Sequence, residues 1–178
     1  MNEIKESVYH GTTDQRVKGI LKSGFYESRK KTEWLGHGIY FFKYQADADW
    51  WAQLQIKRVE NAGQNPVVLV TTISYTPDQL LDLDDWDQLK YFSEFFRKAL
   101  KIAEKEFSLE VMLRKEEKKT WCAACNLFRE AHPDIVVTAY TFQRFHDYNN
   151  LVYSPNQRQV CVSDRGIIGI PAIVEEYL

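Results

Sequence analysis

The chain lacks any apolar run long enough to cross a membrane. Across its 178 residues, no stretch approaches the roughly 20 apolar residues that a membrane-spanning helix requires. The opening segment Met1–Ser7 is polar and has no apolar signal-peptide region. These absences predict a cytoplasmic protein that does not interact with a membrane.

Cysteine is scarce, and neither sign of charge dominates. The three cysteines, Cys122, Cys125 and Cys161, are an odd number, which fits reduced thiols better than a disulfide framework. The formal net charge is -2, so the chain as a whole has no strong attraction for nucleic acid. Any site for a polyanion must therefore be local.

The composition is that of a globular protein, with 44% hydrophobic and 27% charged residues. There is no internal repeat and no low-complexity linker. Because single cores commonly organise roughly 100 to 200 residues, the sequence predicts one domain covering residues 1–178.

The hydrophobic periodicity alternates between helical and strand-like spacing. It predicts helices over Asp14–Ser23, Ala46–Val59, Trp86 to about Leu100, and Glu117–His132. It predicts strands over Ser7–His10, Gly38–Phe42, Pro66–Tyr75, Asp134–Phe142, Arg158–Val162 and, less regularly, around Leu81 and over Arg165–Ile173. Because these elements do not alternate as regular βαβ units, the expected class is α+β.

Two short motifs carry candidate chemistry. V-Y-H-G-T-T offers the ring nitrogens of His10 beside Gly11, whose backbone a planar ligand can approach. W-L-G-H-G-I-Y-F-F begins at Trp34, and its glycines allow a sharp turn that leaves the Tyr40 ring available for stacking. Such groups suit an amide or a ribose. The alternative interpretation is a core aromatic run and a surface histidine.

Taken together and in this order, the motifs resemble the ADP-ribosyltransferase superfamily. The similar branch, of His-Tyr-Glu type, includes the poly(ADP-ribose) polymerases and their small bacterial relatives, with motifs Tyr-His-Gly-Thr and Gly-x-Gly-Ile-Tyr-Phe. The resemblance covers mainly Val8–Ala52 and a segment near Gln159, and leaves Trp86–His132 unexplained. It implies a single-domain fold in which split mixed and antiparallel sheets surround an NAD cleft with flanking helices.

The resemblance also implies roles for the first motif and for the residues around it. His10 would hydrogen-bond the adenosine ribose of NAD, and the Gly11 backbone would hold the nicotinamide carboxamide. Thr12 and Gly38 are the other motif residues expected at the cofactor site.

Aromatic walls are expected around the nicotinamide. Tyr40 would stack on the ring, and Trp51 would form a second wall. Trp50 is the alternative, since adjacent helical residues point about 100° apart and only one can face the pocket well.

The third motif departs from the family pattern. Where polymerase-type members have a catalytic Glu, this chain has Gln159, in the segment N-Q-R-Q-V-C-V, and Gln157 shares its strand face. A neutral amide can bond ribose hydroxyls but brings no negative charge to a developing cation.

The activity implied is mono-ADP-ribosyl transfer from NAD, without a metal, to a protein or nucleic-acid acceptor. By family association, this activity would serve a toxin, effector or phage-defence role. An NAD glycohydrolase, with water as acceptor, and an inert module that binds NAD or ADP-ribose remain alternatives.

Other candidate sites are weaker. C-A-A-C at Cys122 and Cys125 could begin a zinc site but lacks a second pair of ligands, so two buried thiols are the preferred interpretation. Positions that could contact a phosphate or an acceptor, or instead be solvated surface, are His37, Lys22, Arg29, Lys30, Lys31 and the segment Arg97–Lys119. His146 adjoins Asp147 but has no nucleophile at a recognisable spacing.

Overall fold

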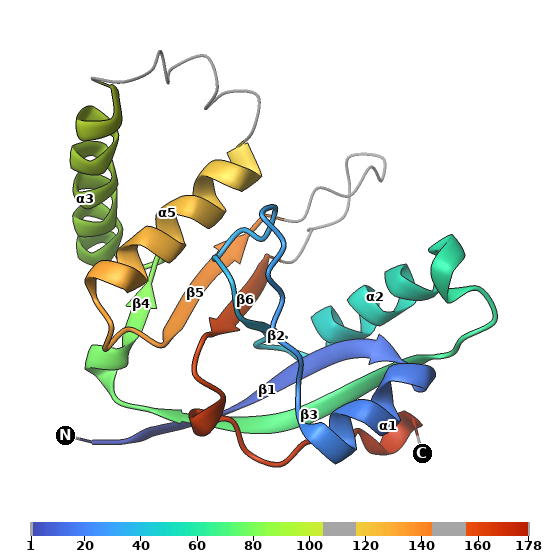
Figure 1. Ribbon diagram of the computed structural model, residues 1–178. Coiled ribbons are helices and arrows are strands. Elements are labelled where there is room, and N and C mark those ends of the chain that lie inside the picture. Colours follow the sequence, from blue (N-terminus) through green and yellow to red (C-terminus); the bar gives the residue numbers. More distant parts are fainter. Residues whose placement is uncertain (1, 105–116, 144–155, 178) are drawn as a thin grey trace, which may run out of the picture.

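The structure is a computed structural model that describes residues 2–104, 117–143 and 156–177. Within these ranges the chain forms one α+β unit with a mixed seven-stranded sheet (Figure 1). The α-helices are α1 (Asp14–Ser23), α2 (Gln45–Ile56), α3 (Trp86–Glu104) and α5 (Glu117–Ala131). The strands are β1 (Ile4–Thr13), β2 (Ile39–Phe42), β3 (Pro66–Tyr75), β4 (Leu80–Asp82), β5 (Val137–Phe142), β6 (Gln157–Val162) and β7 (Ala172–Ile173).

The strand order is β4-β5-β6-β2-β1-β3-β7. Neighbouring strands are antiparallel except β4 and β5, which are parallel. A long ladder joins β1 to β3, from Ile4↔Tyr75 to Thr13↔Pro66. By contrast, β1 meets β2 at a single pair, Tyr9↔Phe42.

The expected split into separate sheets is therefore wrong for the described residues. Their strands form one continuous sheet, in which a β4-β5-β6-β2 half joins a β1-β3-β7 half through Tyr9↔Phe42. The physical reason is that one pair of backbone contacts is enough to connect two strands that otherwise diverge.

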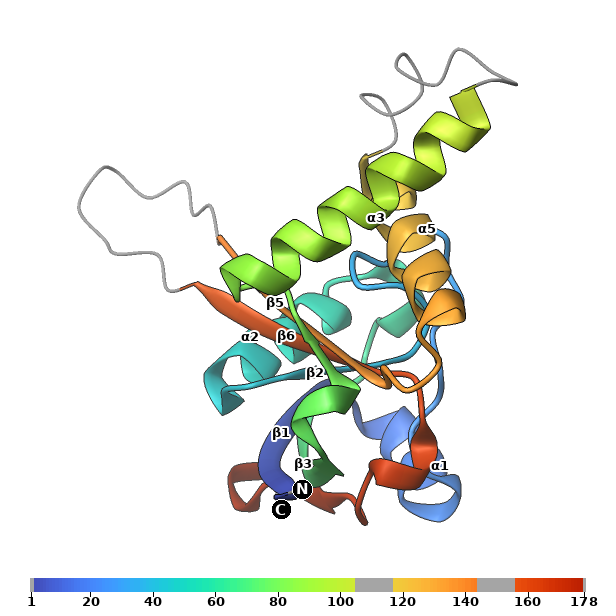
Figure 2. The same cartoon turned by 90° about the vertical axis from the view of Figure 1, so that its left-hand side faces the viewer.

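Helices cover both faces of the sheet, because side chains alternate along each strand. On one face, Val17 and Ile20 of α1 join the main core with Val8, Phe41 and Val160. The opposite face is divided: α2 covers the β1-β3 side, while α3 and α5 cover the β4-β5 side (Figures 1 and 2). The point where β1 meets β2 lies between these two coverings.

Most expected elements appear with shifted ends. Pro66–Tyr75 is a strand with the bounds expected from its β-branched residues, and α1 also has its expected bounds. β1 is longer than expected, and α2 ends at Ile56. None of the helices in the described ranges combines the length and apolarity of a membrane span.

The strand expected over Arg165–Ile173 is mostly wrong. The segment begins with a 3-10 turn at Arg165–Ile167, Ile168 forms an isolated bridge with Ile73, and β7 is the only strand in it. Ile170 is 92% exposed, and Pro171 cannot donate to a ladder. Alternating apolar residues therefore did not correspond to a buried strand here.

Candidate functional site

An open stretch of backbone lies where β1 and β2 diverge. The amide of Asp14 donates to Asn65 O at 3.0 Å, so along the unbroken β1–β3 register the even-numbered residues of β1 face β3. The N–H and C=O of Gly11 therefore point away from β3, toward β2.

The same alternation orients β2. Lys43 N donates to Arg158 O at 3.0 Å, so Phe41 bonds β6 while Tyr40 and Phe42 direct their backbone groups toward β1. Phe42 pairs with Tyr9, but the next position, Gly11 opposite Tyr40, forms no ladder pair. The two backbones face each other across a gap in the ladder.

His10 bridges this gap. Its Nδ1 lies 2.9 Å from the carbonyl oxygen of Tyr40, and because a carbonyl can only accept, Nδ1 carries the proton. Burial lowers the pKa of His10, an effect that the hydrogen bond to Tyr40 partly opposes. The neutral ring, packed edge-on against Phe25 and Phe41, therefore offers Nε2 as an acceptor.

Gly11 is required by the packing of α2. A Cβ on Gly11 would lie 2.0 Å from the backbone oxygen of Ala48. This observation corrects the interpretation that the missing side chain leaves room for a ligand: α2 occupies that space, and the available groups are the backbone N–H and C=O at the strand edge.

The Tyr40 hydroxyl holds the preceding turn. It donates to Gly36 O at 2.7 Å and accepts from Leu35 N at 2.9 Å, and burial strongly raises its pKa. Gly36 has φ 84°, and a Cβ on Gly38 would lie 2.5 Å from Cys161 Sγ. The backbone conformation at Gly36 and the packing at Gly38 thus explain why both positions are glycine. The Tyr40 side chain is half-buried.

Gln159 lies on the same sheet face as Tyr40. Tyr40 pairs with Cys161 and Phe42 pairs with Gln159, so Tyr40 and Gln159 are diagonal neighbours across β2 and β6. The side chain of Gln159 is half-buried, and its Nε2 donates to Gln157 Oε1 at 3.0 Å.

Trp51 packs at the edge of this surface. Its ring centroid lies 6.3 Å from that of Phe42, and it joins the cluster of Phe42, Ala48 and Val68. The guanidinium carbon of Arg58 lies over the Trp51 ring, 5.6 Å from its centroid. The ring of Trp50 is also adjacent to the Trp51 ring.

The structure therefore gathers most, but not all, of the expected residues. One face of the sheet carries Gly11, Tyr40 and Gln159, together with Trp51, which packs on Phe42. The His10 side chain reaches the gap between β1 and β2 from the opposite face. Thr12 is 3% exposed and, one residue after Gly11, its side chain points to the opposite face. Thr12 is thus part of the interior.

Two cavities lie outside this set of residues. One of about 230 Å³ is lined by Gly24, Phe25, Ile39 and Arg165, and the Phe25 ring also contacts the His10 ring edge-on. The other, of about 340 Å³, lies beside Tyr91, Phe128 and His132. Arg165, which no sequence motif indicates, donates to Phe25 O.

The thiols are buried. Cys122, Cys125 and Cys161 are free, and burial raises the pKa values of Cys125 and Cys161 to about 12. In the parts of the chain that the structure describes, no group of three or more His, Cys, Asp or Glu side chains could hold a metal ion.

The remaining candidates are peripheral or outside the described residues. His37 donates its backbone N–H to Asn126 at 2.8 Å. The basic positions Lys22, Arg29, Lys30 and Lys31 are exposed. His146 and most of Arg97–Lys119 fall outside the described residues.

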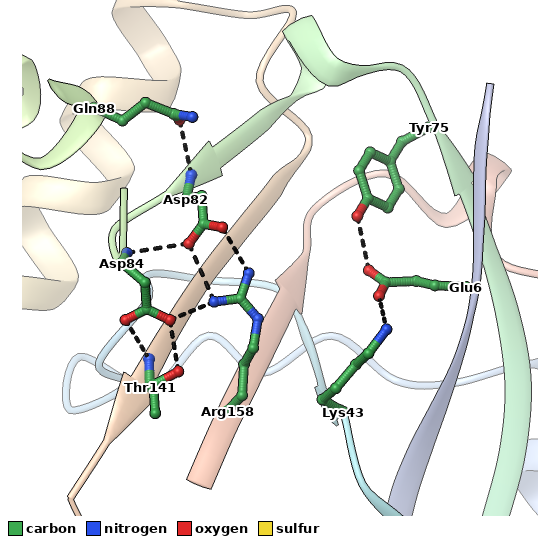
Figure 3. A network of polar contacts seen from close by, with 8 residues as sticks. All are labelled: Glu6, Lys43, Tyr75, Asp82, Asp84, Gln88, Thr141 and Arg158. Carbon is green, nitrogen blue, oxygen red and sulfur yellow. Dashed lines mark hydrogen bonds and ion pairs between the residues drawn. The ribbon is translucent and has the colours of Figure 1, made fainter. Parts of the chain in front are cut away.

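On the opposite face, an ion-pair network ties β6 to the end of β4 and the turn after it (Figure 3). Arg158 donates to both oxygens of Asp82, at 3.1 and 2.8 Å, and also pairs with Asp84. Asp84 accepts from Thr141 N at 3.0 Å. Nearby, Glu6 accepts from Tyr75 at 2.8 Å and pairs with Lys43. Neither group was expected from sequence patterns, because the partners are distant along the chain.

Comparisons with protein-family models, curated proteins and solved structures found no match to this chain.

Proposed function

We propose that this chain is an NAD-dependent mono-ADP-ribosyltransferase with a macromolecular acceptor, built on a fold of the ADP-ribosyltransferase type. The observation that carries the proposal is the break in the β1–β2 ladder at Gly11, which faces Tyr40 without forming a ladder pair, with Gln159 on the same face as the Tyr40 ring.

A carboxamide matches this edge chemically. Its NH₂ donates and its C=O accepts, so it can bond the C=O and N–H of Gly11 as a neighbouring strand would. Nicotinamide bound in this way would bring its ring to Tyr40, while Nε2 of His10 would accept a hydrogen bond from a hydroxyl of the adenosine ribose. Trp51 would contribute a second aromatic wall.

The reaction breaks the bond between ribose C1′ and the nicotinamide nitrogen. The bonding electron pair leaves with nicotinamide, which becomes neutral, and C1′ acquires oxocarbenium character. A lone pair on the acceptor then bonds C1′, and the acceptor proton passes to water. Positioning and electrostatic stabilisation of the transition state would supply the acceleration.

Gln159 determines which form of this chemistry we propose. Chain growth requires a base that activates the hydroxyl of a previous ADP-ribose unit, and a neutral amide cannot act as that base. A single transfer to a stronger nucleophile requires only that the ribose be held. Product should therefore carry one ADP-ribose unit per site.

The absence of charge at Gln159 also favours a second candidate, an inert module that binds NAD or ADP-ribose. A carboxylate would stabilise the developing cation directly, whereas the amide contributes only a dipole. The two candidates differ in turnover rather than in binding.

The deciding experiment uses NAD labelled in its adenine, incubated with the protein and a cell extract. Label in macromolecules, as single units, supports the proposal. Conversion to free ADP-ribose would indicate a glycohydrolase, and unchanged NAD that nevertheless binds in calorimetry would indicate the inert module.

Two variants connect the result to the site. Gln159→Ala should reduce turnover by about 10- to 1000-fold with a much smaller change in NAD affinity. Gln53→Ala, at an exposed position of α2, is the matched control and should leave both unchanged. Full activity in Gln159→Ala would show that another residue has this role.

A further inference from the structure

Gln157 is a buried polar residue with an incompletely satisfied amide. It is 5% exposed and lies two residues before Gln159 on β6, so both side chains share a sheet face. Its Oε1 accepts from Gln159 Nε2 at 3.0 Å, while its own Nε2 is buried without a hydrogen-bond partner among the described residues.

The hydrogen bond between these two residues determines how Gln159 presents its amide. An amide group is planar, and its oxygen and nitrogen lie on opposite sides of the axis of the Cγ–Cδ bond, about 120° apart. Since the nitrogen of Gln159 is directed toward Gln157, its carbonyl oxygen points away from Gln157. The half-buried Gln159 thereby presents an acceptor, which is the one function of a carboxylate that an amide retains.

We propose that Gln157 is a positioning residue. It holds the Gln159 amide so that the amide oxygen of Gln159 accepts a hydrogen bond from a hydroxyl of the nicotinamide ribose. This inference rests on the proposed function and adds the reason why a Gln can serve at this position. Without Gln157, the Gln159 amide would rotate, and either its NH₂ group or its oxygen could face the ribose.

The buried, unpartnered nitrogen of Gln157 gives the inference a distinctive test. Gln157→Leu removes that unsatisfied donor together with the acceptor that orients Gln159. A purely structural role predicts that the variant loses stability. The positioning role predicts that it unfolds at an equal or higher urea concentration while its kcat falls by about tenfold or more and its Kd for NAD changes less than about threefold.

Gln157→Glu is the conservative control, because it keeps an oxygen that accepts from Gln159 Nε2. Its kcat should remain at no less than about one third of the wild-type value. Gln53→Leu, at the exposed position on α2, controls for replacing a glutamine by leucine and should leave kcat unchanged.

The outcomes separate this inference from the proposed function. An active wild-type protein whose Gln157→Leu variant keeps full kcat would overturn the inference alone, as would equal losses in Gln157→Leu and Gln157→Glu. Wild-type protein that neither binds nor cleaves NAD would contradict the proposed function, and the inference would fail with it.

Discussion

His10 connects the two strands at the point where their ladder ends. Its ring is enclosed by Phe25 and Phe41. This burial disfavours the charged form and lowers the pKa of His10 below its ordinary value of 6.5, although the hydrogen bond from Nδ1 to Tyr40 O opposes part of the shift. The sign of the linkage follows: the contribution to stability is present above the unfolded-state pKa and is lost as the pH falls through the folded-state pKa.

We therefore predict that acidification weakens the wild-type protein more than His10→Asn, whose amide can still donate to Tyr40 O. Urea unfolding at about pH 7.5 and about pH 5 should show a larger loss of unfolding free energy for the wild type. Equal losses in the two proteins, with circular dichroism confirming that both are folded, would contradict the assignment.

Tyr40 has two separable parts. Its hydroxyl bonds Leu35 N and Gly36 O, so Tyr40→Phe should lower the unfolding free energy by about 1–3 kcal/mol, because two buried partners lose their hydrogen bond.

The aromatic ring remains in Tyr40→Phe, so the affinity of this variant for NAD should change little. Tyr40→Ala should weaken binding by at least about tenfold, or roughly 1.4 kcal/mol. Calorimetry showing equal affinities in both variants would contradict a stacking role.

At the scale of elements, Gly11 controls how closely α2 approaches β1. Gly11→Ala would bring its Cβ to 2.0 Å from Ala48 O, so the helix must shift, and we expect a loss of about 1–3 kcal/mol or more. Gly19→Ala in α1 is the control, since its Cβ would meet only the flexible, exposed side chain of Tyr26. Urea denaturation that ranks the two variants equally would be inconsistent with this packing.

Arg158 joins β6 to the end of β4 across β5. Its guanidinium bonds Asp82 bidentately and also pairs with Asp84, and this partly buried geometry makes such pairs stronger than exposed ones. Arg158→Met should lower the unfolding free energy by about 1–3 kcal/mol, because two carboxylates lose their partner. Arg29→Met, which removes an exposed pair with Glu27, should cost far less in the same thermal or urea assay.

The sequence predicted elements well where local chemistry determines them. The β-branched run Pro66–Tyr75 and the Asp14–Ser23 helix, which ends at Gly24 with φ 77°, have their expected bounds. It failed at Arg165–Ile173, where Pro171 and the exposed Ile170 interrupt the pattern. The short motifs name the candidate site residues, but the burial of Thr12 and the hydrogen bond between Gln159 and Gln157 depend on strand pairing that no local pattern encodes.

For the molecule as a whole, the two halves of the sheet share a hydrophobic core, although among the described residues only one backbone pair, Tyr9↔Phe42, joins them. Val8 and Leu69 from one half belong to the same buried cluster as Val137 and Val160 from the other. Hydrophobic burial of this kind couples the halves far more strongly than the Tyr9↔Phe42 contact alone.

We accordingly predict one cooperative unfolding transition. Trp51 reports on the β1-β3 side and Trp121 on the α3-α5 side. In variants in which one of these is the sole tryptophan of the chain, the fluorescence midpoint in urea should agree with the circular dichroism midpoint of the same variant within about 0.3 M. Two resolved midpoints would show that the halves are separate folding units.

The position of Arg158 between Gln157 and Gln159 means that the two faces of β6 cannot change independently. A strand that slipped by one residue would exchange its faces, which would remove Arg158 from Asp82 and turn both glutamines away from Tyr40. The ion pairs on one side thus keep the strand in the alignment that the opposite side requires. In related sequences we expect Asp82 and Asp84 to vary as little as the residues of the proposed NAD site, although the two carboxylates lie on the opposite face of the sheet.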